Sequence, residues 1–317
     1  MSNSLWIEKY RPKTFEQVRG QHEIVKRLKA FVKAGNLPHL LFVGPPGIGK
    51  TTLSLVIANE LFGLERNQNY LELNSSDERG IDVIRIKVKD FARTKAIIDV
   101  PFKVIFLDEC DALTREAQQA LRRTMETYSA SCRFILSCNY SSKIIDPIKS
   151  RCSIFKFRPL AKENLRELVE EIKVSENLKI EDGAVEKIIE FSGGDERQLE
   201  NILQSAAAIS KEITASLVKE IASSAEPVGL KESLEIALTG DFVTARSKLI
   251  DSMLNNGLSG LDLIKHIQKE IWDLKILDAD KLRLIEKCGE IEFRLVEGAD
   301  DSVQLEALLA SFALTKK

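Results

Sequence analysis

The sequence predicts an α/β protein whose first part is a parallel β-sheet with helices on both faces and whose remainder is helical. Short runs of β-branched and aromatic residues alternate with helix-like patterns in the first half of the chain, as in βαβ units. These runs are apolar throughout, which indicates strands that are covered on both faces. They stop near Pro159, and patterns with apolar residues at steps of three and four continue from there.

The individual elements follow from these patterns in chain order. We expect five strands, at 39–43, 70–74, 103–107, 132–138 and 153–157. The spacing then predicts amphipathic helices over 162–176, 182–191 and 197–209. SSAEPVG, at 223–229, is small and contains proline and glycine, as linkers do. Further helical patterns follow, broken at Gly240, Gly257–Gly260 and Gly298. The sequence therefore predicts three domains, over 1–158, 159–224 and 225–317.

The composition predicts a globular protein of the cell interior. Of 317 residues, 44% are hydrophobic and 30% are charged, and no apolar run reaches the roughly 18 residues needed to cross a bilayer. The N-terminus has no charged and then apolar leader, so we expect no secretion. Five cysteines without a Cys-x-x-Cys pair indicate reduced thiols that pack as small hydrophobic residues. Three scattered histidines argue against a Cys/His metal centre.

Charge is unevenly distributed along the chain. Residues 1–158 carry 26 Lys and Arg against 17 Asp and Glu, whereas 159–222 carry 8 against 14 and 223–317 carry 12 against 17. The net charges are thus +9, −6 and −5, which sum to the −2 of the whole chain. A basic domain followed by acidic ones is expected where a module that handles a polyanion is joined to modules that handle proteins.

The sequence GPPGIGKT, at 44–51, predicts a phosphate-binding loop. It lies between a predicted strand and a helix-like segment, which is the context that the G-x-x-x-x-G-K-[ST] pattern requires. Glycines allow backbone N–H groups to surround phosphate oxygens, and the helix adds its positive N-terminal end. Lys50 would supply charge to the β- and γ-phosphates, and the Thr51 hydroxyl would ligate Mg²⁺. The predicted nucleotide-binding residues here are Gly44, Pro45, Pro46, Gly47, Ile48, Gly49, Lys50, Thr51 and Thr52.

Polar residues end two further predicted strands. Asp108 and Glu109 follow the apolar run KVIFL, and Asn139 follows CRFILSC. Asp108 would hold Mg²⁺ through water, and Glu109 would polarise the water that attacks the γ-phosphate, because phosphoryl transfer depends mainly on positioning. Asn139 would orient the same water; a simple turn-forming role is the alternative.

Eight motifs occur in an order that carries a family resemblance. Along the chain they are WIEKYRP, GPPGIGKT, NSSDERGID, FLDECDAL, ALRRTME, SCNY, SRC and GGDERQLEN. This order resembles the small subunits of replication factor C, in the clamp-loader branch of the AAA+ ATPases. The resemblance covers 5–205 motif by motif, and the last ninety residues in length and helical character. It implies an AAA+ sheet domain, a small helical lid and a helical collar, with ATP and Mg²⁺ as ligands. Two departures, at Ile48 and at Glu196 between Asp195 and Arg197, touch no catalytic atom.

The resemblance also implies roles for residues that spacing alone does not single out. Ile7, Arg11 and Val18 would lie near the adenine base. Arg197 would reach from the lid to the γ-phosphate and couple lid closure to the nucleotide state. Arg151, in SRC, would point into the ATP site of a neighbouring subunit and stabilise charge on the transferring phosphoryl group. Without the resemblance, Arg151 and Arg197 would be read as solvated surface arginines.

Residues 77–95 are the best candidate for a nucleic-acid contact. Helical spacing produces an apolar stripe beside an exposed cationic one, formed by Ile84, Val88 and Phe91 and by Arg85, Lys89 and Arg93 respectively. A regular cationic ridge suits sequence-independent contacts to DNA phosphates, and a solvated helix face is the alternative. The resemblance favours DNA, because it assigns backbone contacts to Arg79 and Arg85. The predicted DNA-binding residues are Arg79, Arg85 and Lys89.

Taken together, the resemblance implies an ATPase subunit that opens a PCNA-type sliding clamp and loads it onto primer–template DNA. Its partners would be a large subunit and further small-subunit copies in a pentameric ring, in an archaeal cytoplasm or, in a eukaryote, the nucleus. The helical tail would be the main oligomerisation element. Its apolar stripe would either join subunits or pack within its own domain, as illustrated by Leu261, Ile264, Ile267 and Ile271.

Two alternatives remain open from the sequence. One is another AAA+ DNA-remodelling ATPase, such as a branch-migration helicase, a helicase loader or an initiator. Against it, Asp108 and Asn139 are only 31 residues apart, with no room for a helicase hairpin, and 230–317 shows no strand pattern of a winged helix. The other is a non-hydrolysing structural subunit of the same ring. Such subunits lose the loop lysine or the glutamate, whereas Lys50 and Glu109 are both present.

Overall fold

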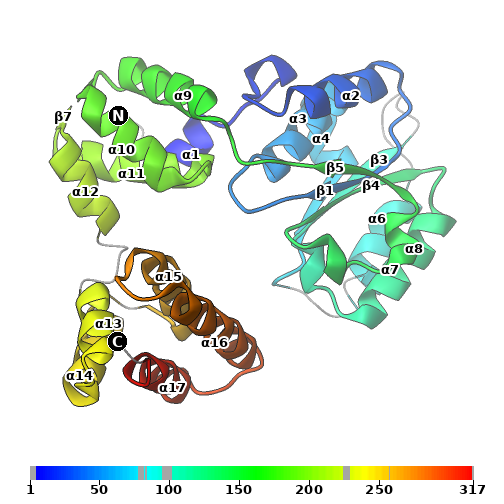
Figure 1. Cartoon of the computed structure of the whole chain (residues 1–317). Helices are drawn as coiled ribbons and strands as arrows, with labels where there is room; N and C mark the ends of the chain where they lie inside the picture. The colour runs from blue at the N-terminus through cyan, green and yellow to red at the C-terminus, as the bar shows by residue number, and fades with distance from the viewer. Residues whose placement is uncertain are drawn as a thin grey trace. The chain divides into compact units, whose positions relative to one another are not determined.

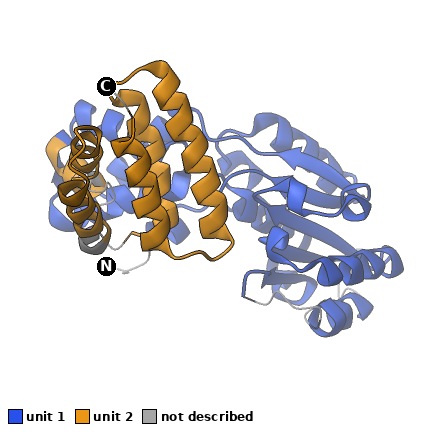
Figure 2. Cartoon of the chain, turned by 60° about the horizontal axis from the view of Figure 1, so that its bottom comes forward, with its two compact units in different colours: residues 1–215 blue, residues 216–317 orange. Residues whose placement is uncertain are grey.

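The computed structural model describes residues 5–77, 82, 84–94, 102–223, 229–256 and 258–315. The chain forms two compact units, residues 1–215 and 216–317, which Figure 2 shows in different colours. The sheet and the helices directly after it belong to unit 1, and the C-terminal helices form unit 2. The finer division into three domains stays a prediction.

A parallel sheet of five strands lies in unit 1 (Figure 1). The strands are β1 (His39–Val43), β2 (Tyr70–Asn74), β3 (Lys103–Asp108), β4 (Cys132–Cys138) and β5 (Cys152–Lys156). All five predicted strands are therefore confirmed, with shifts of one residue in β3 and β5. Their order is β2-β3-β4-β1-β5, so the loop that follows β1 leaves the interior of the sheet next to the end of β4.

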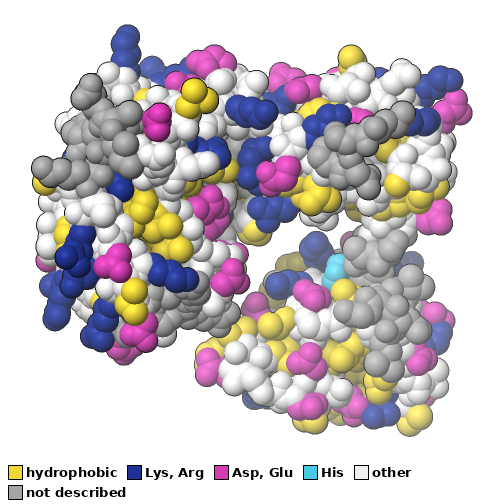
Figure 3. All heavy atoms as spheres, turned by 180° about the vertical axis from the view of Figure 1, so that it is seen from behind, with side chains coloured by type: hydrophobic (Ala, Val, Ile, Leu, Met, Phe, Trp, Pro, Cys, Tyr) yellow, Lys and Arg dark blue, Asp and Glu magenta, His cyan; other side chains and the backbone are white. Residues whose placement is uncertain are grey.

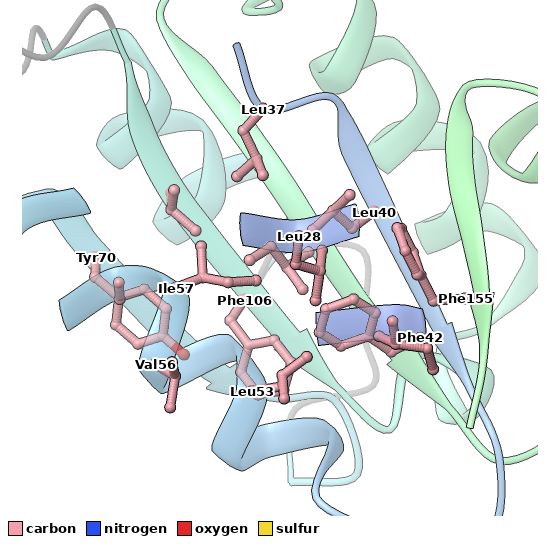
Figure 4. Packing of buried hydrophobic residues seen from close by; sticks show 14 of the residues in the cluster. Leu28, Leu37, Leu40, Phe42, Leu53, Val56, Ile57, Tyr70, Phe106 and Phe155 are labelled. Carbon is pink, nitrogen blue, oxygen red and sulfur yellow. The ribbon is translucent and has the colours of Figure 1, made fainter. Parts of the chain in front are cut away.

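Helices cover both faces of the sheet, as predicted. One face carries α2 (His22–Lys33) and α3 (Lys50–Phe62), and the other carries η3 (Ile84–Val88), α6 (Lys89–Arg93) and α7 (Arg115–Thr127) (Figure 1). Side chains alternate between the two cores, since Phe42 of β1 packs with α2 and α3 whereas Leu41 packs with α7. Figure 4 shows the first core, with Leu53 of α3 beside Phe106. Burial on both faces explains why these strands are apolar throughout.

Short elements join these layers in unit 1. They are α1 (Trp6–Lys9), η1 (Phe15–Gln17), η2 (Gly63–Glu65), α4 (Arg66–Asn69), η4 (Cys110–Ala112), η5 (Ser141–Lys143) and α8 (Asp146–Lys149). The cysteines mostly pack as small hydrophobic residues, as predicted: Cys152 is half-buried and the other four are buried. Burial raises the pKa of Cys132 to about 12, which keeps this thiol protonated.

The three helices predicted after Pro159 are confirmed as α9 (Lys162–Ser175), α10 (Asp182–Ser192) and α11 (Glu196–Ile209). The expectation that strands end at Pro159 is wrong in one detail. β6 (Lys179–Ile180) and β7 (Glu212–Ile213) pair in parallel as a separate two-stranded ladder. Two residues are too few to produce a readable alternation, so the sequence pattern missed them. A further helix, α12 (Ala215–Ser223), follows β7.

Unit 2 consists of helices packed around a core of their own. Those that form this core are α13 (Leu230–Leu238), α14 (Phe242–Asn256), α15 (Gly260–Asp273), α16 (Asp278–Val296) and α17 (Asp301–Ala313), and nearly all of α12 also falls in this unit. The predicted apolar stripe packs within this core, because Ile264, Ile267 and Ile271 are buried and Leu261 packs against them. Other large apolar side chains, including Trp272 and Phe293, are exposed, and yellow side chains are visible on this unit in the lower part of Figure 3. None of the described helices is long and apolar enough to pass through a membrane.

Candidate active site

Three strand ends meet at one edge of the sheet. Because β3, β4 and β1 are parallel neighbours, Asp108, Asn139 and the loop after Val43 come together there. A pocket at this edge brings together most of the residues predicted to act on a nucleotide. From the loop and α3 it is lined by Pro46, Gly47, Gly49, Lys50, Thr51 and Thr52. Asp108, Glu109, Asn139 and Arg197 line it from other elements.

The Lys50 side chain lies beneath the phosphate-binding loop. Its Nζ donates to the carbonyl oxygens of Gly44 and Pro45, at 2.6 Å each, and to Asn139 Oδ1 at 3.0 Å. Burial lowers the pKa of Lys50 from its ordinary value, against the opposing effect of the nearby Asp108 carboxylate. The hydrogen-bond partners of this ammonium group are neutral oxygens, so an anion that enters the pocket would be attracted to it.

Thr51 and Asp108 lie in direct contact. The Thr51 hydroxyl donates to Asp108 Oδ2 at 2.7 Å, and the backbone N–H of Glu109 donates to Asp108 Oδ1 at 2.9 Å. Hydroxyl and carboxylate oxygens beside phosphate-binding groups are what Mg²⁺ prefers in nucleotide sites. The side chains present therefore fit a magnesium–nucleotide complex, with Thr51 and Asp108 as the residues that would hold the ion.

Glu109 has a backbone conformation that few residues other than glycine adopt. Its φ is 51°, in the left-handed region, and its side chain is exposed and lines the pocket. Such conformations are often kept at functional sites, where the surrounding structure enforces them. Nearby, Ser137 Oγ is buried in the wall of the pocket and has no hydrogen-bond partner among the described residues. This oxygen could accept or donate a bond to a water or a ligand.

The first turn of α11 lies directly against the phosphate-binding loop. The backbone N–H of Glu196 donates to the Gly47 carbonyl oxygen at 3.0 Å. Asp195 caps this helix by accepting from Gln198 N–H at 3.0 Å, and its carboxylate occupies the space where a side chain at Gly47 would lie. This contact positions Arg197 at the pocket, and its role toward a γ-phosphate stays a prediction.

Of the three residues predicted to bind the base, two line the pocket and one does not. Ile7 and Arg11 line the pocket, whereas Val18 packs against the core of α2 and α3 and lines a separate groove. The N-terminal segment is tied to the later helices: Trp6 N–H donates to Gln204 Oε1 at 3.0 Å, and the Tyr10 hydroxyl donates to Glu176 Oε1 at 2.7 Å. Within the loop, the side chain of Ile48 is buried in the core of α2 and α3, away from the pocket.

Sequence reasoning missed several residues of the pocket, notably Ser137, Glu196 and Glu200. The two glutamates are one helical turn apart on a helix that was predicted and that carries Arg197. That spacing was a usable signal, because it places the three side chains toward one side of α11. Ser137 carried no signal, since it reads as part of a buried strand.

Arg151 lies apart from this pocket. It is exposed, directly before β5, and its guanidinium donates to the Pro147 carbonyl oxygen at 2.6 Å and contacts the carboxylate of Glu126. It does not line the nucleotide pocket of its own chain. This placement is compatible with action on another subunit.

The cationic ridge has the predicted exposure over its described part. Ile84 and Val88 are buried against the sheet, and Arg85 and Lys89 are exposed. Both cations line a groove to which α7 contributes, among others, Gln119 and Arg123. Sequence reasoning did not include Arg123 because it lies on a different helix. Arg79, the third predicted DNA-binding residue, lies outside the described residues.

Comparisons with known proteins agree with this arrangement. Residues 40–160 match the ATPase family associated with various cellular activities (AAA), and residues 225–311 match the replication factor C C-terminal domain. Among solved structures, a Thermotoga maritima RuvB Holliday junction branch migration motor is similar, with a TM-score of 0.58 and 21% identity. The similarity covers 72% of this chain and 78% of that one, and at this identity it supports the fold alone.

Replication factor C small subunits from several archaea are similar to this protein over nearly the whole chain. A replication factor C small subunit from Methanococcus maripaludis is 55% identical over 98% of this chain and 98% of its own. The corresponding small subunits from Archaeoglobus fulgidus and Staphylothermus marinus are 50% and 52% identical over 99% of this chain. They cover 98% and 95% of their own lengths.

Proposed function

The chain belongs to the replication factor C small-subunit family, the clamp-loader AAA+ ATPases of DNA replication, and we propose that it uses ATP to open a PCNA-type sliding clamp and load it onto primer–template DNA. One observation carries the proposal. Lys50, Thr51, Asp108 and Glu109 line a single pocket in a chain that is 55% identical over nearly its full length to a replication factor C small subunit.

The pocket residues have distinct roles in the proposed hydrolysis. The loop amides and Lys50 bind the phosphates of ATP, and Thr51 and Asp108 hold Mg²⁺. When bound, Mg²⁺ neutralises charge on the phosphate oxygens. Glu109 orients a water for in-line attack and accepts its proton, and Asn139 helps to position that water. The exposed position of the Glu109 side chain, at the mouth of the pocket, supports this role.

Residues from two further elements complete the proposed site. Arg197 binds the γ-phosphate from α11, and the contact between Glu196 and Gly47 supports a coupling of the lid to the loop. Arg151 acts on a neighbouring subunit in a pentameric ring with a large subunit and further small-subunit copies. Its position away from the pocket of its own chain supports this assignment. The archaeal origin of the relatives favours an archaeal cytoplasm as the place of action.

The same proposal assigns DNA contacts to the cationic ridge. Arg85, Lys89 and, by resemblance, Arg79 contact the phosphate backbone without reading sequence. The exposure of Arg85 and Lys89 above buried Ile84 and Val88 supports the assignment.

The proposal is tested by the ATPase rate of the assembled complex. We expect turnover to rise when primed DNA and a sliding clamp are added together, and to rise less with either alone. Complexes that contain Glu109→Gln in every small subunit serve as the control and should not respond. A basal rate that neither DNA nor clamp changes would favour another AAA+ activity. No turnover under any condition would favour a structural subunit that does not hydrolyse ATP.

A further inference from the structure

Glu200 is a buried carboxyl group that the proposed hydrolysis does not use. It lies on α11, is only 3% exposed and lines the nucleotide pocket. Within the described part of the chain it makes no hydrogen bond or salt bridge. Its carboxyl group borders the pocket, so a water or a bound ligand there can supply the hydrogen bonds that the described residues do not.

The position of Glu200 along α11 places it away from the phosphates. Glu196, at the start of the helix, contacts the phosphate-binding loop through Gly47, and Gln204, two turns later, contacts Trp6 of the N-terminal segment. Glu200 lies between them, about 6 Å along the axis from Glu196 at 1.5 Å per residue. Ile7 and Arg11 of the N-terminal segment line the same pocket. Glu200 therefore lies between the phosphate-binding loop and the N-terminal segment, and the side of the pocket lined by Ile7 and Arg11 is where we expect the base of a nucleotide.

The surroundings of Glu200 favour its neutral form. Burial and the negative charge of Glu196 raise the pKa of Glu200 to about 8, against the opposing effects of Arg19, Arg11 and Arg197. A neutral carboxyl group offers one O–H donor and one carbonyl acceptor side by side. An ionised carboxylate offers acceptors only.

Adenine presents a matching pair of groups. Its 6-amino group is a donor, and N7, on the same major-groove edge, is an acceptor. Guanine has two acceptors, N7 and O6, along this edge. We propose that Glu200 selects adenine, its carbonyl oxygen accepting from the 6-amino group and its hydroxyl donating to N7. This inference rests on the proposed function, because it assumes that the pocket binds ATP.

The test compares three nucleotides on the full chain by calorimetry. They are ATP, purine riboside triphosphate, which has a hydrogen atom in place of the amino group, and 2′-deoxy-ATP. We expect the wild-type chain to bind ATP about tenfold or more tightly than purine riboside triphosphate, since loss of the amino group leaves a buried acceptor unpaired. The preference for ATP over 2′-deoxy-ATP measures contacts to the sugar.

Two variants of Glu200 and one control show whether Glu200 causes the preference for ATP over purine riboside triphosphate. Glu200→Leu should bring the ratio of the two affinities for ATP and purine riboside triphosphate close to one. Glu200→Gln should keep the preference, because an amide also offers a donor and an acceptor. Glu190→Gln, an exposed lid substitution on α10, should leave every ratio unchanged. None of the substitutions should alter the preference for ATP over 2′-deoxy-ATP.

The pH dependence provides a second readout that a structural role would not produce. The affinity of the wild-type chain for ATP, divided by that of Glu200→Gln, should fall as pH rises from 7 to 9, because ionisation removes the hydroxyl that donates to N7. Titration of the triphosphate affects both proteins alike and cancels in this comparison. The wild-type preference for ATP over purine riboside triphosphate should not fall, because a carboxylate oxygen still accepts from the amino group.

Each contrary result has a clear meaning. A preference that persists in Glu200→Leu, or that disappears equally in Glu200→Gln, would overturn the inference. So would a change confined to 2′-deoxy-ATP, which would point to the sugar. A wild-type chain that binds all three nucleotides equally would overturn the inference alone, whereas one that binds none would overturn the proposed function with it.

Discussion

The guanidinium group of Arg151 contacts the carboxylate of Glu126 on α7 in the same chain. Arg122 lies on the same helix, with its Nε 3.7 Å from that carboxylate. Arg151 also donates to the Pro147 carbonyl oxygen at 2.6 Å, so its side chain is held in place within one chain. An arginine held in this way loses less conformational freedom when it docks on a neighbouring subunit.

Replacement of Arg151 should separate ATP binding from hydrolysis. Arg151→Ala leaves the phosphate-binding loop intact, so we expect each chain to bind ATP with near wild-type affinity. Hydrolysis by the ring should fall by a factor on the order of 10³–10⁵, the range found for arginines that stabilise the transferring phosphoryl group. Mixing this variant with Glu109→Gln chains should restore measurable turnover at interfaces that combine an intact Glu109 with an intact Arg151. Absence of recovery in rings shown by mass to be mixed would refute action on the neighbour.

Substitutions of Lys50 and Glu109 should impair two different steps, nucleotide binding and hydrolysis. Lys50→Ala removes a buried positive charge that faces the phosphates, so nucleotide binding itself should be lost or strongly weakened. Glu109→Gln keeps this charge, and we expect normal ATP binding with stalled hydrolysis and an accumulated clamp-bound complex. Binding isotherms and single-turnover rates distinguish the two variants. Near-normal turnover in Glu109→Gln would contradict its catalytic role.

The cationic ridge should affect DNA binding without affecting DNA-free turnover. Replacing Arg85 and Lys89 together with alanine removes two exposed cations from one groove. The affinity for primed DNA should fall, most strongly at low salt, and the slope of log affinity against log salt should decrease by about two. Lys26→Ala is a control, because Lys26 is an exposed cation on α2, which covers the other face of the sheet. If the salt slope of the double variant is unchanged, the ridge does not contact DNA and is a solvated helix face.

Much of this organisation could be predicted from the sequence, and the exceptions share a physical cause. The strands could be predicted because both faces of the sheet are covered, so that neighbouring residues such as Leu41 and Phe42 are both apolar. The phosphate-binding loop could be predicted because phosphate binding requires the residue types of GPPGIGKT. Glu200 could not be read as a buried group, since a glutamate in an amphipathic pattern normally faces water. The pocket that it lines is formed in part by Ile7 and Arg11, almost two hundred residues earlier in the chain. Arg123 joins Arg85 for the same reason, through the packing of two separate helices.

Removal of the C-terminal helices should leave a folded, monomeric fragment. Unit 1 and unit 2 have separate cores, so a chain that ends near Glu226 keeps the sheet, the pocket and α11. We expect such a fragment to unfold cooperatively and to bind ATP, but not to assemble with other subunits. Light scattering and nucleotide titration check both points. A truncated chain that still forms rings would show that unit 1 carries the main assembly contacts.

The ionisation of Glu200 should be visible in stability as well as in binding. Its folded-state pKa of about 8 lies above the ordinary value of about 4.3, so the folded chain binds more protons than the unfolded chain between these pH values. Stability should therefore fall as pH rises through this window, by at most about 1.4 kcal/mol per pH unit from this group, and level off above pH 8. Glu200→Gln should lack this contribution in denaturant titrations. Parallel curves for the two proteins would show that Glu200 is ionised in the folded state.

The close approach of Asp195 to Gly47 limits how these two positions can vary. A methyl group at position 47 would lie 1.8 Å from Asp195 Oδ1, and a φ of 68° already disfavours alanine there. Shortening Asp195 would relieve the overlap but would remove the cap that accepts from Gln198. A substitution at Gly47 and a shortening of Asp195 should each lower stability, and the second would not fully restore what the first removes. Packing against α11 therefore requires glycine at position 47. A substitution there should lower the stability of the fold even when no nucleotide is bound.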